Sequence, residues 1–174
     1  RVHPTMIALD HIMANVNGVY NAIYLEGDFV GPNLYYGYGA GKRATGSAVV
    51  SDLMVLARQI RCGVKNLMPP LAHVRPERRE VTIQPIEELL SSYYFRFSAV
   101  DRPGVLSKIS GILGENNISI YSVIQKGRQV EGSVPVVMLT HEAKESSVRR
   151  ALYQLEQLEV LTDKTVTIRV EPSK

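Results

Sequence analysis

The sequence predicts an α+β protein, in which a β-meander and a long helix precede a second unit of order β-α-β-β-α-β. Three observations predict this class. Apolar residues alternate with polar ones in several short runs, which is the period of a half-buried strand. Three other stretches carry apolar residues at helical spacing. Gly, Pro and Asn residues, which favour turns, separate these segments along the 174 residues.

The first part of the chain is predicted to form the β-meander. Asn17 and Gly18 are a strong turn signal, and the run Glu-Gly-Asp that follows the first strand is a second one. We expect the meander to belong to a larger sheet, because so few strands are barely stable alone. The predicted strands are residues 19–25 (VYNAIYL), a return that starts at 29–30, and a short strand at 34–36.

A glycine-rich turn and a long amphipathic helix come next. The turn is residues 36–41 (YGYGAG), and Val49, Leu53, Leu56 and Ile60 mark the helix. Glycines between a strand and a helix let the backbone approach a ligand closely. Their spacing is not that of the dinucleotide fingerprint. The residues alone therefore leave two interpretations open, a crowded structural turn and a ligand contact.

Residues 62–92 are predicted to be a linker that runs over the surface. Four prolines limit helix formation there, and charged residues dominate its middle. Its basic run is interleaved with glutamates and has no aromatic stripe, so a solvated linker is favoured over a nucleic-acid site. One short helical turn is expected at 86–90.

The second unit begins with an alternating strand, in which Tyr93, Phe95, Phe97 and Ala99 share one face. Asp-Arg-Pro-Gly follows. Proline suits the first position of a helix, so the helix is expected to begin at Pro103, with Asp101 beside its first turn. Its apolar stripe is predicted to be Leu106, Ile109 and Leu113, and a strand follows at residues 118–124.

The same alternation of elements continues to the end of the chain. Residues 134–140 (VPVVMLT) are predicted as a strand and residues 148–158 as a second amphipathic helix. Residues 166, 168 and 170 alternate in a last strand. The order β-α-β-β-α-β predicts a ferredoxin-like arrangement, with two helices on one face of the sheet.

Composition excludes several classes of protein. The net charge of +3 is spread along the chain, and no apolar run reaches membrane-spanning length. The single cysteine, Cys62, cannot form an internal disulfide, which fits a cytoplasmic protein, and we expect it to be partly buried. His3 and His11 lack the partner ligands of a metal site, so no metal is expected. The chain begins at Arg1 within a pattern, and we interpret it as part of a longer protein.

The second unit resembles an ACT domain, a module that senses amino acids. The resemblance rests on D-R-P-G-V-L after a strand and N-N-I-S-I at the next strand, and it covers residues 93–171. It implies an effector site at the strand-to-helix turn, completed by the facing edge of a second subunit. Two structural alternatives remain open: Asp101 as a helix cap and Asn117 as a left-handed turn residue. The effector-binding residues implied are Asp101, Gly104, Val105 and Leu106 at the turn, with Asn117 and Ile118 at the facing edge.

The first part of the chain resembles the C-terminal end of the catalytic region of homoserine dehydrogenase. The resemblance covers residues 1–61, through V-N-G-V-Y-N-A-I-Y-L-E-G-D-F-V-G and Y-Y-G-Y-G-A-G-K-R-A-T-G-S-A-V-V-S-D-L. That family reduces aspartate semialdehyde to homoserine with NADH or NADPH, on the route to threonine, methionine and isoleucine. The resemblance implies that Gly39, Ala40 and Gly41 come near the nicotinamide end of the cofactor.

Together the resemblances imply an oxidoreductase portion followed by a regulatory ACT domain, with residues 1–61, 62–92 and 93–174 as catalytic part, linker and ACT domain. The family's cofactor domain and its proton-transfer lysine would precede Arg1. We therefore assign no catalytic residue here and expect no NAD(P) to bind this chain alone. The ACT domains are expected to pair as a homodimer and to bind a pathway end product, L-threonine, for feedback inhibition. The alternative is a non-enzymatic, amino-acid-binding ACT module.

Overall fold

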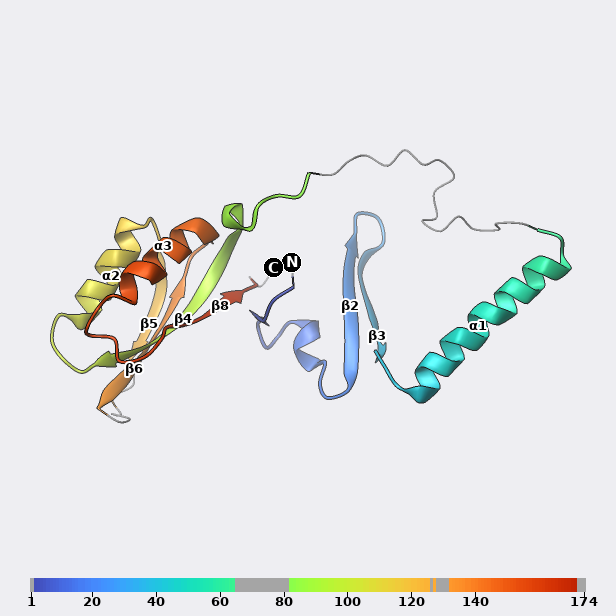
Figure 1. The fold of residues 1–174 in the computed structure, drawn as a ribbon, viewed down its shortest axis with the longest axis horizontal. Coiled ribbons are helices and arrows are strands. Elements are labelled where there is room, and N and C mark those ends of the chain that lie inside the picture. Colours follow the sequence, from blue (N-terminus) through green and yellow to red (C-terminus); the bar gives the residue numbers. More distant parts are fainter. Residues whose placement is uncertain (1, 65–81, 126, 128–131, 172–174) are drawn as a thin grey trace. The chain divides into compact units, whose positions relative to one another are not determined.

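The computed structural model describes residues 2–64, 82–125, 127 and 132–171. Its contacts divide the chain into two units, Arg1–Ala8 with Ile83–Lys174, and Leu9–Thr82. The first residues thus belong with the C-terminal unit (Figure 1). Most of the predicted linker, with its basic run, lies outside the described residues.

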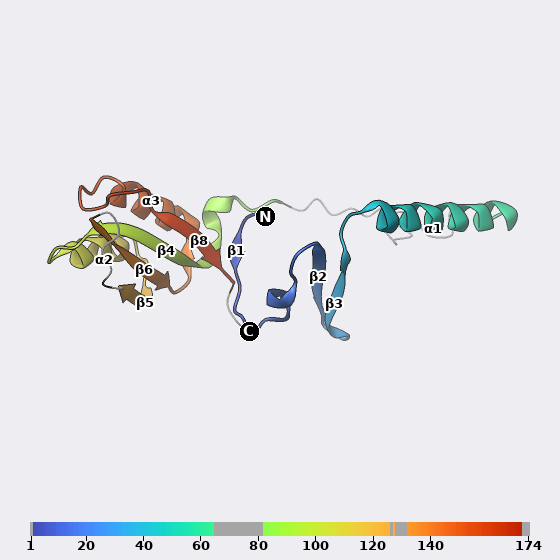
Figure 2. The ribbon, with the colours of Figure 1, turned by 90° about the horizontal axis from the view of Figure 1, so that it is seen from below.

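The C-terminal unit is a mixed sheet covered on one face by two helices (Figures 1 and 2). Along the chain β4, α2, β5, β6, α3 and β8 follow one another, which confirms the predicted β-α-β-β-α-β order. A short β7 (Ala143–Lys144) also pairs with the start of β4. The strands lie in the order β1 (Thr5–Met6), β8 (Val166–Val170), β4 (Leu90–Val100), β6 (Ser133–Thr140) and β5 (Ile120–Gln125), and the helices are α2 (Val105–Glu115) and α3 (Glu145–Leu155).

The core lies between the sheet and these two helices. The predicted inward residues of β4 are at most 1% exposed, and their register partners on β6 are also buried. Burial of this much aromatic and aliphatic surface is the main stabilising contribution to the unit. The helices contribute Val105, Ile109 and Leu113 from α2, with Val148, Ala151 and Leu155 from α3.

The start of α2 differs from the prediction. Gly104, with a φ of 86°, is the N-cap and Val105 is the first helical residue, so Pro103 lies before the helix. The buried stripe consequently runs through Val105, and Leu106 is 41% exposed. Only glycine adopts such a φ readily, so the Gly of Asp-Arg-Pro-Gly ends the turn and places the helix start after it.

The strand β1 was not predicted. Thr5 and Met6 pair in parallel with Arg169 and Val170, and the amide of Glu171 donates to the carbonyl of Met6 at 2.9 Å. Two residues are too few for a period to be recognised in sequence. Their pairing with the far end of the chain depends on β8 offering a free edge.

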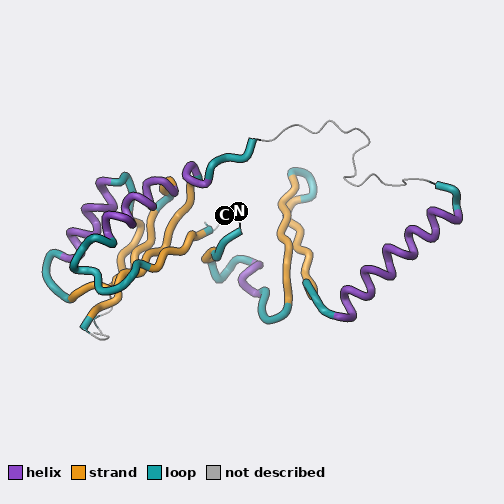
Figure 3. The backbone as a smooth tube through the Cα atoms, viewed as in Figure 1, coloured by secondary structure: helices purple, strands orange, loops and turns teal. Residues whose placement is uncertain are grey.

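The unit of residues 9–82 contains a hairpin and a long helix (Figure 3). Strands β2 (Tyr20–Gly27) and β3 (Gly31–Tyr38) form the hairpin, and α1 spans Lys42–Arg61. The predicted return at 29–30 is wrong, because these residues lie in the connection and Gly31 begins the strand with a φ of 70°. The strand expected at 34–36 is the middle of β3. Within the described residues the hairpin has no third strand, so the larger sheet stays a prediction.

Two short helices complete the description. Ile12–Asn15 form the 3-10 helix η1, whose first turn is capped by His11, because Nδ1 of His11 accepts from the amide of Met13 at 3.2 Å. This gives His11 a structural role. Ile86–Glu88 form the 3-10 helix η2, which confirms the helical turn expected at 86–90.

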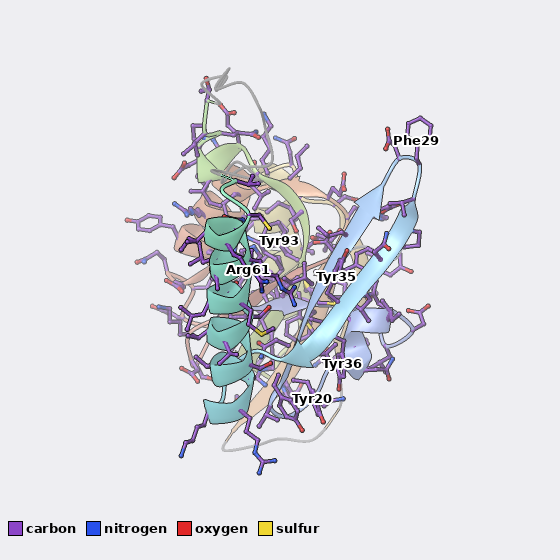
Figure 4. All side chains as sticks on the ribbon, turned by 90° about the vertical axis from the view of Figure 1, so that its right-hand side faces the viewer. Tyr20, Phe29, Tyr35, Tyr36, Arg61 and Tyr93 are labelled. Atoms are coloured by element: carbon purple, nitrogen blue, oxygen red, sulfur yellow. The ribbon has the colours of Figure 1, made fainter. Side chains whose placement is uncertain are left out.

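The hairpin and α1 expose many large apolar side chains. On the hairpin the rings of Tyr20 and Tyr36 stack at 4.8 Å, and Phe29 projects from the tip with 99% of its surface exposed (Figure 4). Helix α1 has no buried residue, and Cys62 at its end is exposed rather than partly buried as predicted. Apolar surface of this extent is typical of an interface.

Candidate effector and cofactor sites

The strand-to-helix turn after β4 lines a cavity of about 330 Å³. This volume is at the lower end of the range for small-molecule sites. One wall is the turn itself, with Asp101, Arg102 and the first residues of α2. The other wall comes from the sheet and is formed by Ala99, Gln125, Val134 and Val136.

The helix start offers hydrogen-bond donors to this cavity. No side chain caps α2, and the amide of Val105 makes only a long bond to the carbonyl of Arg102, at 3.4 Å. The first intrahelical partner is Lys108, whose amide donates to Gly104 at 3.1 Å. Unpaired amides at a helix start attract an anion. A carboxylate and a guanidinium on the adjacent Asp101 and Arg102 add both signs of charge, which suits a zwitterion.

Four of the six predicted effector residues meet at this cavity: Asp101, Gly104, Val105 and Leu106. Asn117 and Ile118 follow the other end of α2 and do not line it. The side chain of Ile118 is in the core, 3% exposed, while Asn117 is exposed with a φ of 58°. Neither residue lines the cavity within one chain, so a role for them at a ligand bound there would require a second subunit.

The structure also tests the two structural alternatives for these residues. Asn117 does adopt the left-handed turn conformation that was one of the open interpretations. Asp101 does not cap α2, since Gly104 occupies the N-cap and no side chain bonds there. Sequence reasoning missed Arg102 and Gln125, although both adjoin motifs that it singled out.

The glycine turn joins β3 to α1. Gly41 is the N-cap of α1, with φ 129° and ψ 149°, a backbone region that is essentially restricted to glycine. Apart from Gly41 itself and its two chain neighbours, no described atom lies within 4 Å of the position that a Cβ on Gly41 would occupy. Gly39 has a different role, because a Cβ there would overlap the side-chain amide of Asn21, whose Cγ would be 2.5 Å away.

These features fit the close approach of a flat ring at Gly41, because this residue has no side chain and the space beside its backbone is open. No acidic side chain lies in the first turn of α1, where Lys42 and Arg43 stand instead. That Gly39, Ala40 and Gly41 approach a nicotinamide ring stays a prediction, and the geometry at Gly41 fits it. Among the described residues no helix is long and apolar enough to cross a membrane.

Comparison with known proteins gives two family matches that do not overlap. Residues 1–54 match the family "Homoserine dehydrogenase", and residues 93–160 match "ACT domain". A homoserine dehydrogenase of Pseudomonas aeruginosa is 44% identical over 172 residues, which are 98% of this chain and 40% of that protein.

The chain therefore matches the homoserine dehydrogenase family in its first part and the ACT domain family in its second.

Two further relatives agree with this assignment. A homoserine dehydrogenase of Neisseria gonorrhoeae is 40% identical over 98% of this chain and 39% of its own length. The crystal structure of a homoserine dehydrogenase from Thiobacillus denitrificans superposes with a TM-score of 0.84 at 40% identity, over 98% of this chain and 38% of that one. The chain thus spans about two fifths of the curated relatives it matches. The glycine turn lies in the homoserine dehydrogenase region, and the cavity at Asp101 lies in the ACT domain.

Proposed function

We propose that this chain is the C-terminal portion of an NAD(P)-dependent homoserine dehydrogenase, in which the ACT domain binds an amino acid and inhibits the enzyme. The observation that carries the proposal is the presence of both family regions in one chain, each with a site of suitable chemistry. The cofactor supplies hydride transfer between aspartate semialdehyde and homoserine. The residues of this chain would shape the nicotinamide end of the site through Gly39, Ala40 and Gly41.

The effector proposed for the ACT domain is L-threonine. Its carboxylate would accept from the free amides at the start of α2, and its ammonium would pair with Asp101. The apolar floor formed by Val134 and Val136 suits its methyl group. Coupling between such a site and a distant active site is typically ~1–3 kcal/mol, and it is reciprocal for binding. Threonine and substrate should therefore weaken each other's binding in the complete enzyme.

The effector proposal is tested by calorimetric titration of the chain with L-threonine. We expect binding in the parent and a loss of about tenfold or more in Asp101→Asn, since a hydrogen bond to a charged group contributes about 1.5–3 kcal/mol. Asp163 is exposed and does not line this cavity, so Asp163→Asn serves as the matched control. No amino acid bound at millimolar concentration, or equal affinities for parent and Asp101→Asn, would show that the site is wrong.

The facing edge is tested separately with Asn117→Gly, which keeps the left-handed backbone and removes the amide. If a second subunit presents Asn117 to the ligand, this variant binds threonine more weakly while its fold is unchanged. Sedimentation of the parent at the same concentrations should then show a dimer. If the chain binds threonine as tightly when it is a monomer as when it is a dimer, the site is not shared between two subunits.

The chain by itself is expected to be catalytically inactive, because its homoserine dehydrogenase region contains the glycine turn but no dinucleotide-binding unit. Homoserine oxidation is measured with NAD and with NADP at high enzyme concentration, against a blank without protein. A rate above the blank would contradict the assignment. Threonine binding without activity in the complete protein would favour the non-enzymatic ACT module instead.

A further inference from the structure

A buried carboxylate lies at the start of α3. Glu145 is 6% exposed, and Arg169 on β8 binds it with two hydrogen bonds, Nη2 to Oε1 at 2.7 Å and Nε to Oε2 at 2.9 Å. The hydroxyl of Tyr93 on β4 donates to the same Oε2 at 2.8 Å. Tyr93 and Arg169 are register partners, so the two strands present their side chains to Glu145 side by side. A two-pronged Arg–carboxylate pair is both strong and geometrically specific.

The protonation states in this cluster are well defined. Burial alone raises the pKa of Glu145, but the bonds from Arg169, Tyr93 and Arg149 together outweigh it and leave the pKa below its ordinary value. Burial, and then the bond to Glu145, raise the pKa of Tyr93 to about 12. At neutral pH the carboxylate is therefore ionised and the tyrosine is its donor.

The chain passes between its two units twice, after Ala8 and again before Ile83. The segment at the first passage, residues 1–8, attaches at this cluster. Thr5 of β1 pairs with Arg169, the residue that holds Glu145, and Met6 pairs with Val170. These residues belong to the homoserine dehydrogenase match, residues 1–54. A strand from that region thus completes the edge of the sheet that carries the ACT domain.

The second passage attaches at the same residue, through the backbone amide of Glu145 and, by way of Arg149, through its carboxylate. The amide of Glu145 donates to the carbonyl of Leu89 at 2.8 Å, just after η2. Arg149, one turn further along α3, donates to Glu145 Oε1 at 3.3 Å and to Glu87 of η2 at 3.1 Å. The segment through which the chain re-enters the C-terminal unit is therefore held by Glu145 both directly and through Arg149.

A packed connection leads from this cluster to the effector cavity. Helices α2 and α3 lie together on the sheet (Figure 2), and Asn116 at the end of α2 donates to Gln154 of α3 at 2.6 Å. The other end of α2 lines the cavity at Asp101. Packed helices move as rigid elements, so a shift at the cavity can reach the start of α3.

We propose that Glu145 and Arg169 form a joint that holds both passages of the chain to the ACT-bearing unit and transmits effector occupancy to the homoserine dehydrogenase region. The second half of this proposal rests on the proposed effector function, whereas the first half does not. Both residues are positioning residues, since neither lines the effector cavity. The joint also explains why a charge is buried where an apolar residue would suffice for stability.

The joint is tested by hydrogen exchange of the full chain, read at single amides by NMR. The amide of Glu171 reports attachment of β1, and the amide of residue 145 reports attachment of η2. In Glu145→Gln and Arg169→Lys we expect both amides to exchange about tenfold faster or more, and by a larger factor than the β6 amides, which report unfolding of the whole unit. In Glu87→Gln only the amide of residue 145 should exchange faster.

The matched control is Arg150→Gln, an exposed arginine of α3 whose side chain bonds Ser147 at 3.3 Å and no other described residue. It should leave both reporter amides unchanged. If the β6 amides of Glu145→Gln exchange as fast as the two reporter amides, the whole unit has been destabilised. Arg169→Lys, which keeps the positive charge, is then the variant that tests the joint. Parent-like exchange at both amides in a folded Arg169→Lys chain would overturn the joint.

Adding L-threonine separates the joint from the effector proposal. In the parent, saturating threonine should change exchange at both reporter amides, and Arg169→Lys should abolish that change while still binding threonine. Binding without any change at the reporters in the parent would overturn transmission through the joint. Absence of threonine binding would contradict the effector assignment alone, because the threonine-free exchange rates already test attachment of the two passages.

Discussion

Replacing Glu145 with alanine is expected to lower the free energy of unfolding of the ACT-bearing unit by about 2–4 kcal/mol. The variant leaves the guanidinium of Arg169 and the hydroxyl of Tyr93 without their shared acceptor. Removing one partner of a buried pair usually costs more than this, but the side chain of Arg169 is 20% exposed and can recover some hydration. A small cavity adds to the loss.

Hydrogen exchange of the β6 amides measures this change, because their protection reports unfolding of the whole unit. Arg150→Ala on the same helix removes a charged side chain that is exposed, and it should change the free energy of unfolding little. A loss below about 1 kcal/mol in Glu145→Ala would mean that the buried pair is energetically neutral, as some are.

The same carboxylate predicts a dependence on pH. Since the pKa of Glu145 is lower in the folded state than in the unfolded chain, its contribution is present above the unfolded pKa and is lost as pH falls through the folded value. Tyr93 acts at the other extreme. Its pKa is raised from about 10 to about 12 in the folded state, so its contribution to stability is lost as pH rises from about 10 through the folded value. Glu145→Gln should flatten the acid limb, and Tyr93→Phe the alkaline limb.

Replacing Gly41 with valine in the complete enzyme is expected to lower kcat/KM about tenfold or more, while threonine binding to the ACT domain is unchanged. A non-glycine residue at φ 129° and ψ 149° is strained by about 1–3 kcal/mol, and the turn would shift to relieve it. In addition, the side chain would enter the open space beside Gly41, where we propose that the nicotinamide lies.

Gly46→Ala is the matched control for this variant. Gly46 lies within α1, and an added Cβ meets no described atom within 4 Å beyond the adjacent backbone of the helix, so alanine should leave kinetics unchanged and favour the helix by about 1 kcal/mol. Gly41→Ala separates strain from occlusion, because alanine imposes the backbone strain with little bulk. Equal kinetics in parent and Gly41→Val would leave the turn with a purely structural role.

Much of the C-terminal unit follows from local pattern. Alternation from Tyr93 to Ala99 predicted a buried face, and those residues are buried. Helical spacing predicted α2 and α3 here, and α1 in the other unit. Such features are readable because period and turn chemistry are properties of neighbouring residues. The four residues at the turn after β4 that line one cavity were implied by the ACT-domain resemblance rather than by local pattern.

Features that depend on distant partners were not readable in this way. The strand β1 exists because β8 offers it an edge, and the third strand expected in the meander merged into β3. Asn117 and Ile118 follow the end of α2 that is opposite the effector turn, so their predicted place at the facing edge depends on a second subunit and stays a prediction. Glu145 carries no sign in its own segment that it is buried. Folding brings Tyr93 and Arg169, which are 52 and 24 residues away in sequence, to the same carboxylate. Only these partners offset the free energy that is lost when an ionised group leaves water.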